Sequence, residues 1–240
     1  MTISANFSTR PTPDAATLLS GFRFPEVELS VLSRQKWKDV FFDSIITEYD
    51  ARRLYWYLEG CHPDVFSILI DVLNPWLRDE IDHAYGFTVI YASYTKIPLD
   101  EILVSVELRK PDFEVIGAVA ADPLALLLTL AYDEIITTHV YHRSIEIYDA
   151  FDSEQLSAWI RKTKKDEVNH FFSFVQKAKK LFPDRLNEVP EILDDIFKID
   201  FEKESYTGTF VLDHNAPDFP ITKDEIRSMI IPAIIKKFRE

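Results

Sequence analysis

The sequence predicts an all-α protein built on a four-helix bundle with a crossover connection. Glycine is scarce, at 5 of 240 residues, and long stretches lack proline, which favours long helices over turn-rich strands. A coarse twofold repeat, two long helix pairs joined by a longer connection, indicates the bundle. Apolar residues form 47% of the chain, enough for one core. We therefore expect one domain over 1–240, with its core bundle at about 36–182 and a C-terminal accessory segment at 183–240.

The first helix pair is predicted from apolar spacing. Residues 1–35 contain three prolines and are expected to be irregular. Residues three or four apart then share one helix face over 35–58. Asp64 can cap a second helix over 65–93, in which Pro75 predicts a kink or a short break.

The second pair follows a connection at 95–123, for which we expect a short helix and a path across the end of the bundle. Asp122 and Pro123 fit the N-cap and first position of a helix. The third and fourth long helices are expected over 124–148 and 154–181. In the tail we expect a helix at 189–197, an extended piece at 206–213 and a last helix from Lys223, bent at Pro232.

Composition narrows the classes of function. The formal net charge of −13 argues against a nucleic-acid binder, which needs a positive face for phosphates. Cys61 is the single cysteine, which excludes an intramolecular disulfide and a Cys-x-x-Cys metal site. The N-terminus has no hydrophobic signal core, and the apolar run at 124–130 is too short to span a bilayer. We expect a cytoplasmic protein with no membrane span.

Two Glu-x-x-His motifs carry the chemistry. Glu80 and His83 lie in "RDEIDHAYGF", and Glu167 and His170 lie in "KKDEVNHFFSF". Residues three apart share a helix face, so each pair can point at one spot among neighbouring aromatic residues. Glu48 precedes Glu80 by 32 residues and Glu134 precedes Glu167 by 33. In two antiparallel hairpins with short turns, this spacing brings each upstream glutamate level with its motif.

A pair of divalent metal ions explains why four carboxylates would be buried together. Without partners, those charges would be very costly in an apolar interior, and two divalent cations balance them. Carboxylate oxygen and imidazole nitrogen without thiolate suit iron or manganese, and zinc also accepts these ligands. The predicted ligands are Glu48, Glu80, His83, Glu134, Glu167 and His170. Asp43 or Glu59 could replace Glu48 if the first turn differs in length.

Acids beside the motifs are expected to orient the histidines. A metal-bound imidazole usually donates its other N–H to a carboxylate or carbonyl. We expect Asp166 to hold His83 and Asp79 to hold His170 across the bundle, with solvated acids as the alternative. His139 and His142 follow Glu134 on the same predicted helix and are expected to form hydrogen bonds between helices, with metal ligands or proton shuttles as the alternative. His62 and His214 are expected to have no special role. The basic run "RKTKK" at 161–165 indicates either a solvated face or a docking site for an acidic partner.

The core helices resemble the ferritin-like di-iron carboxylate superfamily over about residues 36–182. In the second half, "DEIITT" with Glu134 and Thr137, and "DEVNH" with Glu167 and His170, are similar to soluble acyl-acyl carrier protein desaturases of the ribonucleotide-reductase-like branch. The first half matches mainly through Glu48 and "DEIDH". The resemblance implies a two-iron cofactor, O₂ as co-substrate and an external electron donor such as a reductase or ferredoxin. It also implies that Thr137 assists proton delivery.

We therefore expect an O₂-dependent di-iron oxidoreductase of the oxygenase or desaturase type, acting on a hydrophobic small molecule, for which an acyl compound is one candidate. Phe87, Ile136 and Phe174 are expected to line its substrate tunnel, with ordinary core packing as the alternative. Acyl carrier protein stays open as a partner. A homodimer could form through four tryptophans: Trp37, Trp56, Trp76 and Trp159. The competing functions are a ferroxidase or iron-storage protein, a non-catalytic metal-binding helical module and a manganese catalase.

Overall fold

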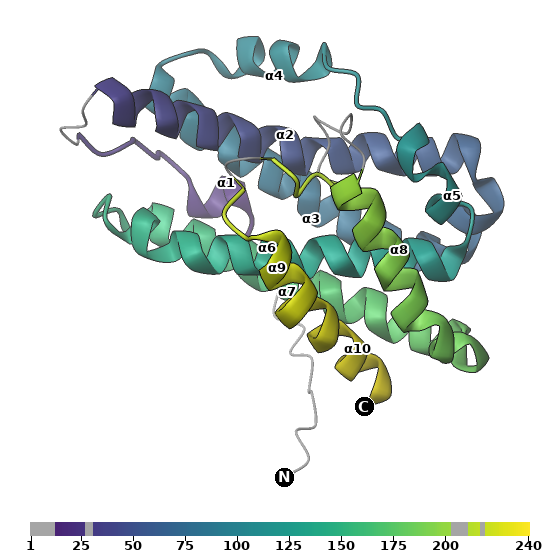
Figure 1. Ribbon diagram of the computed structural model, residues 1–240. Coiled ribbons are helices and arrows are strands. Elements are labelled where there is room, and N and C mark those ends of the chain that lie inside the picture. The colour runs from purple at the N-terminus through teal and green to yellow at the C-terminus, as the bar shows by residue number, and fades with distance from the viewer. Residues whose placement is uncertain (1–12, 27–30, 203–210, 217–218) are drawn as a thin grey trace.

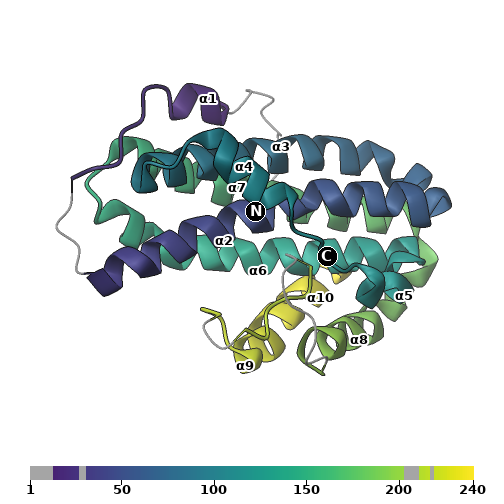
Figure 2. The same ribbon diagram turned by 90° about the horizontal axis from the view of Figure 1, so that it is seen from above.

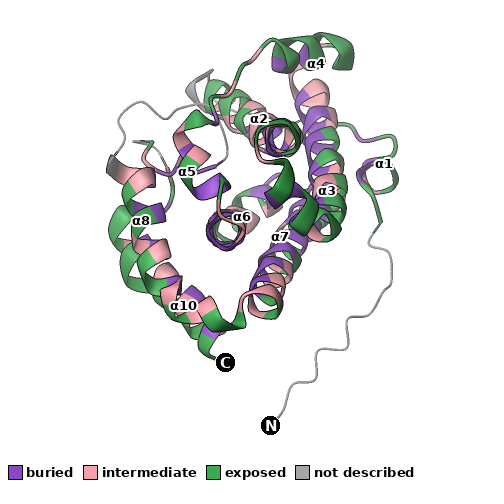
Figure 3. Ribbon diagram, turned by 90° about the vertical axis from the view of Figure 1, so that its right-hand side faces the viewer, coloured by how far each residue is buried: buried purple, intermediate pink, exposed green. Residues whose placement is uncertain are grey.

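Four long helices form the body of the protein in the computed structural model, which describes residues 13–26, 31–202, 211–216 and 219–240 (Figure 1). They are α2 (Val31–Cys61), α3 (Pro63–Thr95), α6 (Pro123–Asp149) and α7 (Glu154–Leu181). Every regular element in the described ranges is helical, which confirms the all-α class. Viewed end-on, the four helices surround one central volume, with α2 packed along α3 and α6 along α7 (Figure 3).

Local signals explain where the long helices begin. Pro63 occupies the first turn of α3, where its missing N–H costs nothing. The Asp122 carboxylate accepts the N–H groups of Leu124 and Ala125 at the start of α6, and the Ser153 hydroxyl caps α7. Helix α3 continues through Pro75, so the expected short break is absent.

The connection between the two helix pairs runs along the outside of α2 rather than across the end of the bundle (Figure 1). It contains α4 (Leu99–Glu107), the 3₁₀ turn η1 (Glu114–Ile116) and α5 (Gly117–Ala120). Arg53 of α2 donates to the carbonyl of Val106 at 2.6 Å, and Arg109 donates to buried Asp50 of α2 at 3.2 Å. These contacts fasten the connection to the first pair.

An N-terminal segment expected to be irregular contains a short helix, α1 (Ala15–Leu18), which lies beside α3 and α7 (Figure 3). The backbone N–H of Ala15 donates to Asp82 at 2.9 Å. Gln155 donates to the carbonyl of Leu18 at 2.9 Å. The segment therefore bridges the two helix pairs on one side of the molecule.

The C-terminal segment covers the outer side of α6 (Figure 2). It contains η2 (Pro183–Glu188), α8 (Val189–Glu202), α9 (Lys223–Glu225), the π-helical turn η3 (Ile226–Ile230) and α10 (Ile231–Arg239). Most of the extended piece expected at 206–213 lies outside the described residues, and 211–212 form a turn. Pro232 lies in the first turn of α10, a position that tolerates proline.

The core is divided along the four long helices by a polar layer. One apolar cluster, which includes Leu54, Trp76 and Phe174, fills one end. A second, which includes Phe41 and Trp159, fills the other. In α2, α3 and α7 the glutamates and histidines described below lie between residues of the two clusters, whereas in α6 Glu134 lies between Tyr132 and Ile136 of the first cluster. No helix in the described ranges is both long and apolar enough to cross a lipid bilayer.

Candidate metal centre

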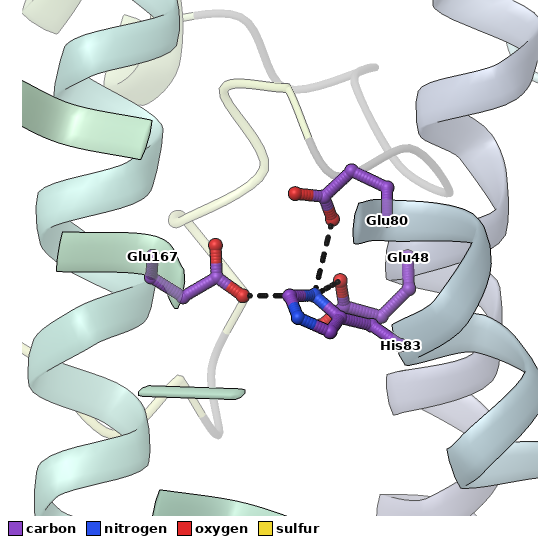
Figure 4. A group of neighbouring side chains, drawn as sticks. All are labelled: Glu48, Glu80, His83 and Glu167. Carbon is purple, nitrogen blue, oxygen red and sulfur yellow. Dashed lines mark hydrogen bonds and ion pairs between the residues drawn. The ribbon is translucent and has the colours of Figure 1, made fainter. Parts of the chain in front are cut away.

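Six acidic and imidazole side chains meet in the polar layer. Glu48 comes from α2, Glu80 and His83 from α3, Glu134 from α6, and Glu167 and His170 from α7. Each is at most 5% exposed. Figure 4 shows Glu48, Glu80 and Glu167 directed at the ring of His83 from helices on opposite sides of the site. The structure thus brings together all six residues that the sequence nominated as ligands.

The six side chains divide into two groups that could each hold a metal ion. The first group is Glu48, Glu80, His83 and Glu167, and the second is Glu80, Glu134, Glu167 and His170. In each group one ligand atom per residue lies within 4.8 Å of the others. We call Glu80 and Glu167, which belong to both groups, the shared glutamates. We call Glu48 and Glu134, which belong to one group each, the outer glutamates.

More carboxylate oxygens surround Nδ1 of each imidazole than one hydrogen bond can satisfy. His170 Nδ1 lies 3.0 Å from Glu80, 3.2 Å from Glu134 and 3.2 Å from Glu167. One ring nitrogen can donate a single N–H, so it cannot satisfy three carboxylates. Oε1 atoms of both shared glutamates are buried without a hydrogen bond, although each lies near an imidazole nitrogen. Oxygen and nitrogen atoms arranged in this way fit a cation between them.

The far side of each imidazole faces an aspartate. His83 Nε2 lies 3.2 Å from Asp166, and His170 Nε2 lies 3.4 Å from Asp79. An imidazole that donates through Nε2 has its Nδ1 lone pair free for a metal ion. Both aspartates therefore stand where they can fix the metal-binding tautomer.

The two histidine sites differ in their surroundings. Asp166 is buried and receives a second hydrogen bond, from Lys162 at 2.8 Å. Lys162 also lies 2.9 Å from Asp82, the residue that holds the N–H of Ala15. Lys162 is only 9% exposed, which contradicts the interpretation of the whole run 161–165 as a solvated or docking face. Asp79, by contrast, is one-third exposed at its side chain and pairs with exposed Arg78.

Aromatic hydrogen-bond donors orient the outer glutamates. Tyr141 donates to Glu48 Oε1, and the indole of Trp76 donates to Glu134 Oε1 at 2.7 Å. Each donor occupies one carboxylate oxygen, and the other oxygen of each outer glutamate lies near a histidine Nδ1. These two donors restrict how the carboxylates can rotate.

Protons balance the charge of this centre when no cation is present. Burial and the charges of the shared glutamates raise the pKa of Glu48 well above its usual range. Burial and the charge of Glu167 do the same to the pKa of Glu134. Despite burial, nearby carboxylates hold the pKa values of His83 and His170 well above their ordinary value. A metal ion would replace these protons, so metal binding and deprotonation are coupled.

The alternatives to Glu48 lie away from the centre. Asp43 and Glu59 are exposed on α2.

His139 is partly buried, and its pKa is lowered by burial and nearby cations. His142 is likewise absent from both ligand groups, and its Nδ1 lies 3.2 Å from the Lys164 ammonium nitrogen.

A small cavity opens at the ligand atoms on the side of α2 and α6. It has a volume of about 20 Å³ and is lined by Thr47, Glu48, Glu80, Asp133, Glu134, Thr137 and Glu167. Phe87, Ile136 and Phe174, expected to line a substrate tunnel, are fully buried in the packed clusters and do not line it. Phe87 packs between Tyr141 and Trp159, so core packing describes it better.

A buried polar cluster behind Glu134 was missed from the sequence. His214, expected to have no special role, is 6% exposed and lies 2.7 Å from Asp200. Tyr132 also donates to Asp200, at 2.8 Å. Burial raises the pKa of Asp133, which faces His214, to about 8. The available signal was Asp133–Glu134, which repeats the Asp-Glu pair of both Glu-x-x-His motifs.

Two of the four tryptophans proposed for a dimer face are unavailable for it. Trp76 and Trp159 are 2% and 0% exposed, whereas Trp56 is 49% exposed. The prediction that all four tryptophans form a dimer surface is therefore wrong for Trp76 and Trp159.

Comparison of the chain with protein-family models, curated proteins and solved structures finds no match. The geometry of the six side chains therefore carries the functional argument.

Proposed function

We propose that the protein is a ferritin-like, four-helix-bundle carboxylate protein that holds two iron ions and acts as an O₂-dependent oxidoreductase. The observation that carries this proposal is the pair of ligand groups joined by the shared glutamates. Four carboxylates and two imidazoles, with no thiolate, form a donor set that suits iron and manganese. A bound iron pair would supply electrons for the reduction of dioxygen.

The residues around the centre have separate tasks in this proposal. Asp166 and Asp79 keep a proton on the outer nitrogen of each histidine, so that both Nδ1 atoms face inward. Tyr141 and Trp76 orient the outer glutamates. The apolar clusters on either side exclude bulk water. Thr137 lines the cavity, and in this proposal its hydroxyl exchanges a proton with a molecule bound there.

The substrate of such an oxidoreductase would be a hydrophobic, acyl-type small molecule, and its electrons would come from a reductase or ferredoxin-type donor. The resemblance of "DEIITT" and "DEVNH" to desaturases supports this class. A ferroxidase is the second candidate, because the cavity of about 20 Å³ holds a molecule of about the size of water. An organic substrate would need space that opens elsewhere or on binding.

Metal stoichiometry tests the proposal. We expect the purified protein, loaded anaerobically with Fe²⁺, to retain two ions per chain, one for each ligand group. Glu80→Gln and Glu167→Gln should weaken both positions, because these residues serve both groups. Glu48→Gln should weaken one. Glu59→Gln, an exposed change in the same helix, is the matched control and should retain both.

Reaction with O₂ separates the two candidates. Stopped-flow absorption of the Fe²⁺-loaded protein should record oxidation that depends on the shared glutamates. Repeated oxidation of excess Fe²⁺ with release from the site identifies a ferroxidase. A single oxidation that needs an external reductant, and whose rate changes with a fatty acyl thioester, identifies the oxygenase or desaturase. A wild-type protein that binds no iron, or whose bound Fe²⁺ is inert to O₂, would refute the proposal.

A further inference from the structure

Asp133 is a buried acid at the metal-centre cavity whose role the six ligands leave unexplained. It precedes Glu134 on α6, is 2% exposed and lines the cavity together with Thr47 and Thr137. Its Oδ1 accepts the backbone N–H of Leu212 at 3.2 Å. Its Oδ2 is buried and has no hydrogen-bond partner. Buried polar atoms of this kind normally bind water or a ligand.

The segment 211–214 fixes the orientation of this carboxylate. Leu212 is fully buried and has a φ of 54°, a left-handed backbone conformation that costs energy for a residue with a Cβ. The N–H of His214 donates to Asp200 at 3.0 Å, and its ring lies 2.7 Å from the same carboxylate. Figure 4 shows the C-terminal segment as a pale yellow-green loop behind the site. With Oδ1 held by this segment, Oδ2 is the atom left for the cavity.

The size and lining of the cavity define what can bind there. A volume of about 20 Å³ exceeds the roughly 10–15 Å³ needed for one water molecule but excludes an alkyl chain. The lining beyond the ligand glutamates is polar: two threonines and Asp133. A small molecule that forms hydrogen bonds therefore fits better than an apolar one.

We propose that Asp133 is a binding residue for a small polar ligand of one to three heavy atoms, which occupies the cavity beside the metal pair and forms a hydrogen bond with Oδ2. The proposal rests on the two-metal function proposed above and adds a named contact on the open side of the centre. The contact gives Asp133 Oδ2 the partner that it lacks. It also explains the unfavourable backbone conformation of Leu212, because the N–H of Leu212 holds Asp133 Oδ1 and so leaves Oδ2 for the cavity.

Azide binding to the Co²⁺-loaded protein tests the contact, with visible absorption as the readout. In Asp133→Asn, the Leu212 N–H retains the amide oxygen as its acceptor, so the NH₂ group faces the cavity and can donate to azide. Asp133→Leu has a similar volume and no polar atom. We expect azide to bind the asparagine variant about five- to tenfold more tightly than the leucine variant, as one hydrogen bond would give. Equal affinities would overturn the proposal.

Glu59→Gln, an exposed change on α2, is the control. It alters neither the C-terminal segment nor the cavity lining, so its azide affinity should remain within about twofold of wild type. A wild-type protein that binds no Co²⁺ would refute the two-metal function itself. Metal-loaded variants with unchanged azide affinity would refute the role of Asp133 alone.

A crystal structure of the metal-loaded wild-type protein provides a test that needs no variant. We expect an ordered solvent or azide atom within about 3.2 Å of Asp133 Oδ2. Azide bound at the metals but on another side of the centre, with no atom at Oδ2, would overturn the proposal even if the leucine variant fails to fold.

Discussion

Gly86→Ala should destabilise the protein, although the same change inside a helix usually stabilises it. Gly86 lies in α3 one turn after His83. A Cβ atom at this position would meet the indole of Trp159 at 2.1, 2.4 and 2.6 Å, whereas carbon atoms pack best at about 3.5–4.0 Å. Trp159 is fully buried, and its ring lies against that of His83 at 6.2 Å between centroids. The indole would have to move by about 1 Å or more, toward neighbours that leave no space.

The magnitude follows from two opposing effects. Overpacking a core costs about 1–3 kcal/mol, and contacts this short belong at the upper end. Alanine gains about 1 kcal/mol over glycine in a helix. The net expectation is a loss of about 1–2 kcal/mol, and Tm should fall by about 2–4 °C per kcal/mol for a chain of this size. Gly60→Ala, where a Cβ would meet nothing within 4 Å, is the matched control and should gain about 0.5–1 kcal/mol.

Urea unfolding followed by circular dichroism measures both variants. Trp159→Phe should remove most of the cost of Gly86→Ala in the double variant, because the atoms that clash belong to the indole; this would appear as non-additivity. If Gly86→Ala proves as stable as Gly60→Ala, the close packing of α3 against Trp159 is wrong.

The remaining predictions concern protons and charge at the centre. The metal-free protein should lose stability as pH rises from about 5 to about 8. The pKa values of the outer glutamates and Asp133 are raised in the folded state, so the folded protein holds protons that the unfolded chain releases. A Tm that rises over this pH range in scanning calorimetry would contradict this prediction. Metal binding at pH 7 should release more than one proton per chain, measurable by titration calorimetry in buffers of different ionisation enthalpy, where identical heats would exclude it. Lys162→Met should cost about 3 kcal/mol in urea unfolding, because it removes the ammonium partner of buried Asp166 and of Asp82. Lys162→Arg should recover most of this loss, and equal stability of the two variants would contradict a role for the charge.

Apolar spacing and helix-start signals located the long helices. Helices α3 and α7 bury one face, whereas α6 is buried on every face over 124–134 and was recognised from Asp122 and Pro123 at its start. The fourth was predicted at 154–181 and α7 spans Glu154–Leu181, while the third was predicted at 124–148 and α6 spans Pro123–Asp149. The path of the connection could not be predicted in the same way. Its position along α2 depends on the hydrogen bonds that Arg53 and Arg109 donate. Each of these bonds joins two residues that are more than 50 positions apart in the sequence.

The convergence of the six candidate ligands followed from the spacing of the motifs, since helix geometry fixes which residues share a face. The surroundings of the centre did not follow. Lys162 lies in a run of basic residues that is typical of a solvated surface, and its burial arises from Asp82, Asp166 and the covering segment at α1. His214 belongs to a segment without periodicity, and its partner Asp200 lies in α8. Such contacts depend on tertiary structure that no local pattern encodes.

Neither helix hairpin contains all the residues of either ligand group. Glu80 belongs to the α2–α3 hairpin and Glu167 to the α6–α7 hairpin, yet both ligand groups need both residues. If the chain were cleaved in the connection near Lys110, neither fragment would contain all four residues of a ligand group. With the proposed metal ions bound, the two fragments would have to associate around those ions, and a chelator that removes them should separate the fragments.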